Sequence, residues 1–517
     1  MNSARPFKLS LISVCIACLL QFNFASPLAG DVTLPALFSD NMVIQCGMRL
    51  PVWGWAEPGE KVRVRLDYLS AQTVADSGGR WRVSLDPLGV GGPFELVVSG
   101  KNAIVIKNVL AGEVWLCSGQ SNMAMTVGRS LSAAEEIASA DYPKIRHFQV
   151  RRFKASQPLE DVAPVEQQAG SRLNTWEVAS AETVGRFTAV GFFFARALHR
   201  RLDVPVGIIN SSWGGTTAEA WTAGEALAAD PELKAILSDW PDYNNDEQWL
   251  KEQFAEFSAE VEKARREGHP KPLYFNQPSV LYNGMIAPLI PYPIRGAIWY
   301  QGESNAYRAY QYRRLFQCMI LNWRATWGLG DFPFLFVQLA NFEAGSAVWP
   351  ELRQAQSMAL SLPKTAMAVA ADIGQADDIH PKNKQEVGRR LALAARAILY
   401  GEDIIYSGPI FESITVEDSR CWIRFTHTGD GLASRGETLA GFTIAGEDRN
   451  FIQAEAEIEG NTVVVWSDKI EKPAAVRYGW KDNPEEANLY NRSGEEIYLP
   501  ASPFRTDDWP GLTAGRK

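Results

Sequence analysis

One stretch of the sequence decides the class of fold: Gly112-Glu113-Val114-Trp115-Leu116-Cys117-Ser118-Gly119-Gln120-Ser121-Asn122-Met123. Its apolar run, residues 114–117, predicts a buried strand. Ser121 then lies just past the carboxyl end of that strand, where the chain turns into a helix. Reactive groups of α/β folds gather at this place, because a hydroxyl there is exposed and its backbone N–H points into the site. Ser121 is therefore a candidate nucleophile that needs partners.

From residue 110 to 400, strand patterns alternate with helical patterns. Apolar-rich helices are predicted at 190–202 and 384–399. Further strands are predicted at residues 206–210, 294–300, 334–337 and 366–370. Such alternation predicts a mostly parallel sheet with helices on both faces. The charged stretch 225–275, with a predicted helix at 247–266, is typical of an insertion over that sheet.

The segments on either side of this α/β region are rich in strands instead. Residues 30–109 contain period-two runs such as 62–66 and 81–85, separated by Gly- and Pro-rich turns, and predict a β-sandwich domain. Residues 401–517 also lack helical periodicity, with strands predicted near 423–425, 438–443 and 462–466. The sequence therefore predicts a multidomain α/β protein with an N-terminal β-sandwich and a C-terminal β-rich domain.

The first 29 residues have the pattern of a secretory signal peptide. Arg5 and Lys8 precede an apolar run from Leu9 to Leu20, and small residues follow. No other long apolar run exists, so we expect an exported mature chain, secreted or periplasmic, without membrane insertion. A net charge of −9 over 517 residues argues against a nucleic-acid partner. The four cysteines beyond the leader lack metal-type spacing, so we expect buried thiols and no metal site.

A serine nucleophile needs a base, and the chain contains five histidines. Four have ordinary settings in helices, strands or a charged loop: His147, His199, His269 and His427. His380 differs, because Asp377-Asp378-Ile379-His380-Pro381 lies after a predicted strand and before a predicted helix. In a turn, Asp377 can reach back to the imidazole Nδ1–H and leave Nε2 for the serine. An aspartate that caps the following helix is the competing interpretation.

An ester hydrolase also needs donors aimed at the oxyanion of its tetrahedral intermediate. The backbone N–H of Ser121 is one. Gly214 or Gly215, after the strand 206–210, can supply a second without a side chain in the way. Asn305 or Gln301, after the strand 294–300, can add a side-chain amide. All these groups follow predicted strands at one edge of the sheet, so we expect them to converge.

At these residues the chain resembles the SGNH (GDSL-like) hydrolases, and among them the sialate O-acetylesterase family of carbohydrate esterases. The resemblance rests on blocks 112–123, 213–216, 298–305 and 377–381, and on the N-terminal stretches 37–43 and 51–55. It implies an SGNH-hydrolase fold for residues 110–400. It also implies that Ser121 is the nucleophile, His380 the base and Asp377 the acid.

The resemblance further implies hydrolysis of O-acetyl esters on sugars, notably 9-O-acetylated sialic acids, without a metal or organic cofactor. Gln120, Trp213 and Glu303 are the candidate substrate-binding residues in its motif blocks. Trp299 lies in a strand, where core packing is the stronger prediction than stacking on sugar. Two alternatives stay open at this point: an esterase acting on acetylated xylan or another polysaccharide, and a non-catalytic glycan-binding protein.

Overall fold

The computed structural model describes residues 31–165, 172–238, 255–269 and 271–516. The predicted signal peptide lies outside these ranges, as does the first part of the predicted helix at 247–266. Within them, no helix combines the length and the apolar character needed to cross a membrane.

A seven-strand path forms the centre of the molecule. In spatial order it runs through β13 (Thr365–Val369), β12 (Phe334–Gln338), β11 (Gly296–Tyr300), β7 (Ala103–Gly119), β10 (Val206–Ser212), β8 (Asp141–Gln149) and β9 (Trp176–Ser180). Neighbours from β13 to β8 pair in parallel, and only β9 is antiparallel to its neighbour. The prediction of a mostly parallel sheet is confirmed.

The register of the sheet brings three strand ends to one level. Gly119 at the end of β7 pairs with Ser212 at the end of β10 and with Tyr300 at the end of β11. Side chains just beyond these strands therefore emerge at one edge of the sheet, as predicted for parallel neighbours.

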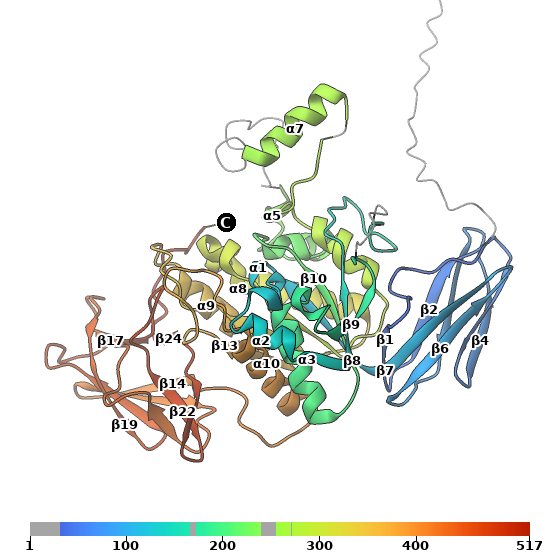
Figure 1. Ribbon diagram of the computed structural model, residues 1–517. Coiled ribbons are helices and arrows are strands. Elements are labelled where there is room, and N and C mark those ends of the chain that lie inside the picture. Colours follow the sequence, from blue (N-terminus) through green and yellow to red (C-terminus); the bar gives the residue numbers. More distant parts are fainter. Residues whose placement is uncertain (1–30, 166–171, 239–254, 270, 517) are drawn as a thin grey trace, which may run out of the picture.

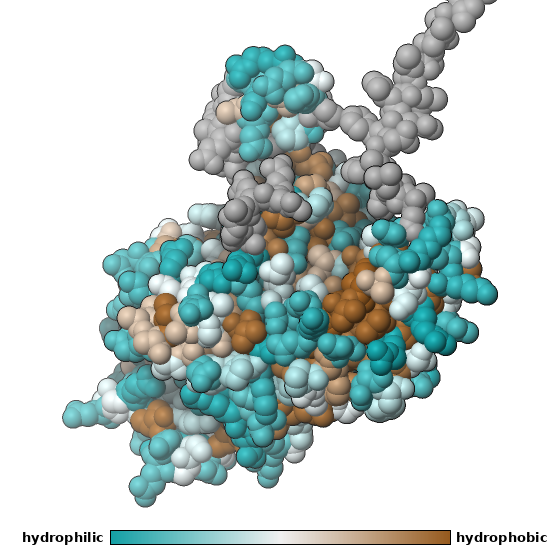
Figure 2. Space-filling view, turned by 45° about the vertical axis from the view of Figure 1, so that its right-hand side comes forward, coloured by the Kyte–Doolittle hydropathy of each residue, from teal (hydrophilic) through white to brown (hydrophobic). Residues whose placement is uncertain are grey.

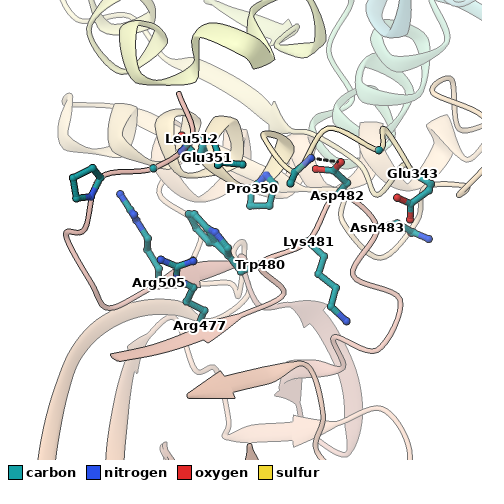
Figure 3. Close-up of a pocket in the computed structure, with 14 residues that line it drawn as sticks. Glu343, Pro350, Glu351, Arg477, Trp480, Lys481, Asp482, Asn483, Arg505 and Leu512 are labelled. Carbon is teal, nitrogen blue, oxygen red and sulfur yellow. Dashed lines mark hydrogen bonds between the residues drawn. The ribbon is translucent and has the colours of Figure 1, made fainter. Parts of the chain in front are cut away.

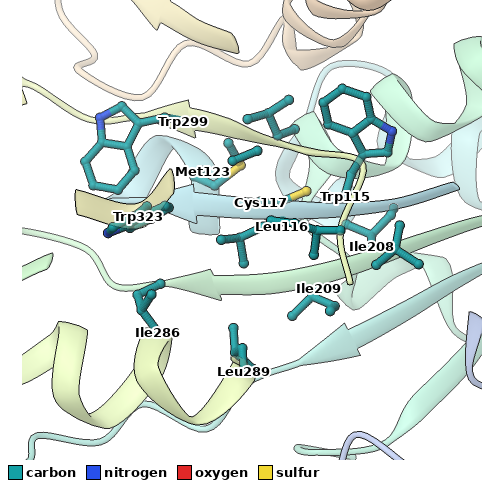
Figure 4. Close-up of a cluster of buried hydrophobic side chains, with 14 of the residues drawn as sticks. Trp115, Leu116, Cys117, Met123, Ile208, Ile209, Ile286, Leu289, Trp299 and Trp323 are labelled. Atoms are coloured by element: carbon teal, nitrogen blue, oxygen red, sulfur yellow. The ribbon is translucent and has the colours of Figure 1, made fainter. Parts of the chain in front are cut away.

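Helices cover both faces of this sheet (Figure 1). On one face lie α3 (Ala189–Leu202) and α10 (Lys384–Ile398), which pack on each other. On the other lie α8 (Ala309–Trp327) and α9 (Trp349–Ser357). Trp299 of β11 meets Trp323 of α8 edge-on, with ring centroids 5.8 Å apart, and both are buried (Figure 4). Trp299 is thus a core residue, as the strand pattern predicted.

The N-terminal segment is all-β, as predicted, but it is not separated from the central sheet by a linker. Its strands are β1 (Val43–Gln45), β2 (Leu50–Trp55), β3 (Lys61–Leu66), β4 (Leu69–Val74), β5 (Arg80–Leu85) and β6 (Gly91–Ser99). The first part of β7 pairs with β6, and its last part pairs with β10 and β11. The expected boundary at residues 109–110 therefore falls inside one continuous strand, and buried side chains form one core across it.

The C-terminal segment is β-rich, as predicted, and has a hydrophobic core of its own. Its three small sheets comprise β14 (Ile410–Glu417), β15 (Arg420–Thr426), β20 (Thr462–Trp466) and β19 (Glu455–Glu459); β16 (Leu432–Ser434), β22 (Leu489–Ser493) and β23 (Glu496–Pro500); and β18 (Ile452–Gln453), β17 (Phe442–Ala445), β21 (Ala475–Tyr478) and β24 (Phe504–Arg505). The strand expected at 438–443 starts only at Phe442.

Short helices fill the connections. They are α1 (Ser121–Ala124), η1 (Val127–Arg129), α2 (Ala133–Ala138), η2 (Val184–Arg186), η3 (Ala218–Trp221), α4 (Gly224–Ala229), α5 (Ala235–Ser238), α7 (Ala255–Glu267), η4 (Tyr282–Ile286), η5 (Ala287–Leu289), η6 (Glu303–Arg308) and η7 (Met358–Ser361). Helix α7, part of the predicted insertion, stands away from the sheet in Figure 1, and its surface is largely hydrophilic in Figure 2.

Candidate active site

Ser121 is the first residue of α1 and follows β7 after a tight exit. Gly119 makes that exit possible: its φ is +134°, and a Cβ there would lie 2.2 Å from the carbonyl oxygen of Tyr300. Ser121 is partly exposed. Neither its Oγ nor its N–H hydrogen-bonds to any residue in the described ranges. The serine therefore presents an unengaged hydroxyl and an unengaged donor at the edge of the sheet.

The loop after β10 lies directly against this serine. The N–H of Trp213 donates to the carbonyl of Gly119 (3.0 Å), which fixes the start of the loop. A Cβ built on Gly214 would lie 3.2 Å from the Cβ of Ser121. Across the described chain, no acceptor is found for the N–H of Gly214. Of the two predicted glycines, Gly214 is the one that contacts the nucleophile, while Gly215 lies beside the Phe275 ring.

The two predicted side-chain amides have other partners in the structure. Gln301 is buried and uses its amide nitrogen on the carbonyl of Thr216 (3.0 Å) and on Asn305 Oδ1 (2.7 Å). Asn305, also buried, donates to Glu219 (3.0 Å) and accepts from the N–H of Ala218 (2.9 Å). Both side chains brace the loop that carries Gly214. Gln301 uses both amide hydrogens in this way, which does not favour it as an oxyanion donor. Asn305 Nδ2 donates one hydrogen bond, to Glu219, and its role as an oxyanion donor stays a prediction.

His380 lies in the turn between β13 and α10, and its side chain is one-third exposed. The turn is tied to the nucleophile's helix, because Asn122 Nδ2 donates to the carbonyl of Ile379 (3.0 Å). Partial burial lowers the pKa of His380; Asp378 opposes this, whereas Lys384 and Arg129 lower it further. A lowered pKa leaves the imidazole neutral near pH 7, which is the state that a general base requires.

The carboxylate predicted as the acid, that of Asp377, does not contact the imidazole in the structure, so its role stays a prediction. Asp377 is exposed, and within the described residues it forms no hydrogen bond or ion pair. The carboxylate near the imidazole is that of Asp378, whose Oδ1 lies 3.7 Å from His380 Nδ1 and accepts the backbone N–H of His380 (2.8 Å). The bond from the His380 N–H to Asp378 closes a local turn. From sequence alone, an aspartate that closes such a turn looks the same as one that contacts the imidazole.

The predicted substrate-binding residues divide between surface and interior. Trp213 is half-buried and stacks on Phe275, with ring centroids 5.8 Å apart. Gln120 is buried, and its side-chain oxygen is 3.4 Å from the N–H of Ser304. Glu303 accepts a hydrogen bond from Asn122 (2.7 Å). Trp213 has an aromatic surface that a sugar can reach, Gln120 is buried and Glu303 is half-buried, so the structure favours Trp213 among the three predicted substrate-binding residues.

The four remaining histidines have structural surroundings, as expected. His147 is buried against Phe187, with ring centroids 4.4 Å apart, and burial lowers its pKa to about 3. His199 Nδ1 is 2.8 Å from the carbonyl of Val204 at the end of α3. Among the described cysteines, none forms a disulfide, and three of the four are buried. His380 thus stays the candidate base, because its turn is hydrogen-bonded to the helix that carries Ser121.

Two polar residues near the site were missed by the sequence analysis. They are Asn122, which directly follows the candidate nucleophile, and Lys384, which begins the helix predicted after His380. In the structure both are buried, and Lys384 Nζ donates to Asn122 Oδ1 (2.6 Å). Lys384 is unusual because it is a buried cation at the first position of a helix, where the helix dipole disfavours a positive charge.

A cavity of about 550 Å³ lies where the C-terminal sheets meet α9 (Figure 3). Arg477, Trp480 and Arg505 line it on one side, and Pro350 and Glu351 line it on the other. Both arginines pair with the buried carboxylate of Asp507. The polar groups that line this cavity therefore serve mainly to join the C-terminal sheets to the region of α9.

Comparison with known proteins agrees with this geometry. A family model described as carbohydrate esterase, sialic acid-specific acetylesterase, matches residues 111–235 and 272–397. Sialate O-acetylesterase of Mus musculus is 31% identical, over 88% of this chain and 90% of the relative. The enzyme of the same name from Homo sapiens is 31% identical, over 95% of this chain and 94% of the relative.

A solved structure is also similar. The crystal structure of a carbohydrate acetylesterase from Xanthomonas citri superposes with a TM-score of 0.80 at 39% identity, and covers 93% of this chain and 100% of that one. Fold, site and relatives together define an ester hydrolase. More specifically, the chain belongs to the sialic acid-specific acetylesterase family of carbohydrate esterases. The alternative of a non-catalytic glycan-binding protein is set aside.

Proposed function

We propose that this carbohydrate esterase removes 9-O-acetyl groups from sialic acids through an acyl-enzyme intermediate on Ser121. One observation carries the proposal: the unengaged Oγ and N–H of Ser121 lie against Gly214 and beside the His380 turn. The arrangement supports the proposal, because ester hydrolysis by a serine enzyme needs a nucleophile, a base and backbone donors for the oxyanion.

The reaction follows in two halves. Ser121 Oγ attacks the acetyl carbonyl carbon while His380 takes the hydroxyl proton, and the N–H groups of Ser121 and Gly214 bind the oxyanion. The bond to the sugar oxygen breaks, and His380 returns the proton to that oxygen. Water then attacks the acetyl-serine with His380 again as base, which releases acetate and restores Ser121.

The acid that orients His380 is one of two neighbouring carboxylates. The resemblance to the family assigns Asp377. The 3.7 Å approach of Asp378 to the imidazole favours Asp378 instead. A charge on either residue stabilises the imidazolium that forms during the reaction, and matched asparagine variants decide between them.

Arg129 supports a sialic acid substrate over a neutral sugar. It is exposed at the end of η1, which follows the nucleophile's helix, and it forms no ion pair within the described ranges. Its charge acts to lower the pKa of His380. A sialic acid carries a carboxylate that an arginine binds well, whereas acetylated xylan offers none. We therefore propose that Arg129 binds the substrate's carboxylate.

The test measures acetate release from 9-O-acetylated sialic acid and from acetylated xylan. Wild type is compared with Arg129→Gln and with a control, Arg63→Gln, on the exposed face of β3. We expect hydrolysis of the sialic acid and a KM for it about tenfold higher in Arg129→Gln only. Release from xylan alone contradicts the sialate assignment, and release from neither contradicts the proposed acetylesterase activity.

We also propose that the chain is exported, on the strength of the basic and apolar pattern of residues 1–29. Fractionation of cells that express the full chain, with N-terminal sequencing of the product, tests this. We expect an extracytoplasmic protein that lacks the leader, and an intact cytoplasmic chain would contradict the proposal.

A further inference from the structure

A buried chain of polar groups connects the nucleophile's helix to the turn that carries His380. Lys384 Nζ donates to Asn122 Oδ1 (2.6 Å), and Asn122 Nδ2 donates to Glu303 Oε1 (2.7 Å) and to the carbonyl of Ile379 (3.0 Å). Asn122 directly follows Ser121, and Ile379 directly precedes His380. One amide side chain thus fixes the relative position of the two catalytic segments.

The charges in this chain of groups are not directly paired. Lys384 is fully buried at the first position of α10, and its ammonium lies 5.1 Å above the ring of Tyr300. Its connection to the half-buried Glu303 passes through the neutral amide of Asn122, and the buried Oε2 atom of Glu303 has no hydrogen-bond partner in the described structure. Burying a charge without a direct counter-ion is costly, so such an arrangement points to a function.

We propose that Lys384 is a positioning residue of this esterase: through Asn122 it fixes the His380 turn against the nucleophile's helix. This inference rests on the proposed role of His380 as the base. It also explains why a cation occupies a helix start, where the helix dipole is unfavourable to it.

The surrounding charges support this assignment. Burial lowers the pKa of Lys384 to about 7, although Glu303 and Asp378 act to raise it. Burial lowers the pKa of His380, Asp378 opposes this, and the cations Lys384 and Arg129 lower it further. Removal of the Lys384 charge should raise the pKa of His380 and move the acid limb of kcat/KM to higher pH.

The experiment compares the pH profile of kcat/KM for wild type, Lys384→Met, Lys384→Arg and Lys382→Met, on whichever acetyl ester the enzyme hydrolyses. Lys382 is the matched control, because its exposed side chain lies in the same turn. In Lys384→Met we expect an acid limb higher by roughly half a pH unit and a kcat about tenfold lower. Lys384→Arg should return the limb toward the wild-type pH.

The position of the limb does not depend on the amount of folded enzyme, so partial misfolding leaves the comparison valid. If Lys384→Met cannot be recovered folded, Lys384→Gln also removes the charge and takes its place. An acid limb at the same pH in the uncharged variant and in Lys382→Met would overturn the proposal. Failure of the proposed function shows separately, as full activity in Ser121→Ala.

Discussion

Glu113 is the first residue of β7 that pairs with β10, and Ser121 lies two residues past the last one, at the other end of the pairing. The surroundings of the two residues differ in how completely their polar groups are hydrogen-bonded. Glu113 accepts hydrogen bonds from Arg295 Nη2 (2.9 Å) and Tyr400 (3.0 Å), and Cys46 Sγ lies 3.4 Å away. At the other end, the Oγ and N–H of Ser121 bond to no described residue. The fully hydrogen-bonded Glu113 contributes to stability, whereas the unpaired Oγ and N–H of Ser121 are available to a substrate.

The strongest test of this comparison is Ser121→Ala. The substitution removes the nucleophile from the unpaired end and breaks no hydrogen bond among the described residues. We expect kcat/KM to fall by at least about 10⁴-fold while thermal stability stays unchanged. A steady-state assay together with a thermal melt checks both parts, and activity within about tenfold of wild type would exclude Ser121 as nucleophile.

The asparagine variants of Asp377 and Asp378 show which of the two carboxylates orients His380 at the Ser121 end. An asparagine at 378 still accepts the backbone N–H of His380, so Asp378→Asn removes only the charge. We expect one of Asp377→Asn and Asp378→Asn to lose about 10²–10⁴-fold in kcat, and the other to lose less than about fivefold. Steady-state kinetics of both identify the acid, and near-wild-type activity in both would exclude a carboxylate partner for His380 in this turn.

The paired end is tested by Arg295→Met. This change leaves the carboxylate of Glu113, whose side chain is 6% exposed, without its cation. We expect a loss of about 2–4 kcal/mol in the free energy of unfolding, with kcat of the folded enzyme unchanged. The control is Arg49→Met in the exposed Arg49–Asp86 pair, which should cost roughly 0.5 kcal/mol or less. Equal losses in the two variants would contradict the assignment of Glu113–Arg295 to stability.

A smaller effect is expected from Gly214→Ala. The added methyl would meet the Cβ of Ser121 at 3.2 Å, so the loop must move away and carry its N–H with it. We expect kcat to fall about 10–100-fold with KM nearly constant, because an oxyanion donor acts mainly in the transition state. Gly215→Ala, which meets only Phe275 at 3.8 Å, should leave a larger share of kcat despite the strain of its φ of +75°. Equal losses would remove the distinction between the two glycines.

Much of the fold follows from local pattern, because apolar runs and helical periodicity report burial directly. The strand ending at Tyr300 and the helix starting at Lys384 were predicted for this reason. The continuity of β7 through residues 109–110 was not, because its two halves carry different signals: alternation beside β6 and an apolar run beside β10.

The site was predictable in its residue types and less so in its contacts. Ser121, Gly214 and His380 each follow a strand of the parallel sheet, so their positions in the sequence predict that they gather at one edge. A sequence does not show which partner an amide side chain finds, so the hydrogen bonds by which Gln301 and Asn305 brace a loop were not predicted. Lys384 was not predicted as a site residue because its role depends on burial, and a lysine is normally expected to be exposed.

Covalent labelling is the most direct test of Ser121 as the nucleophile. The full chain is treated with a fluorophosphonate, which reacts with activated serines, and the modified peptide is mapped by mass spectrometry. The account predicts a single adduct on Ser121, loss of acetate release in proportion to labelling, and no adduct in Ser121→Ala. An adduct on another serine with parallel loss of activity, or full activity after complete labelling of Ser121, would contradict it.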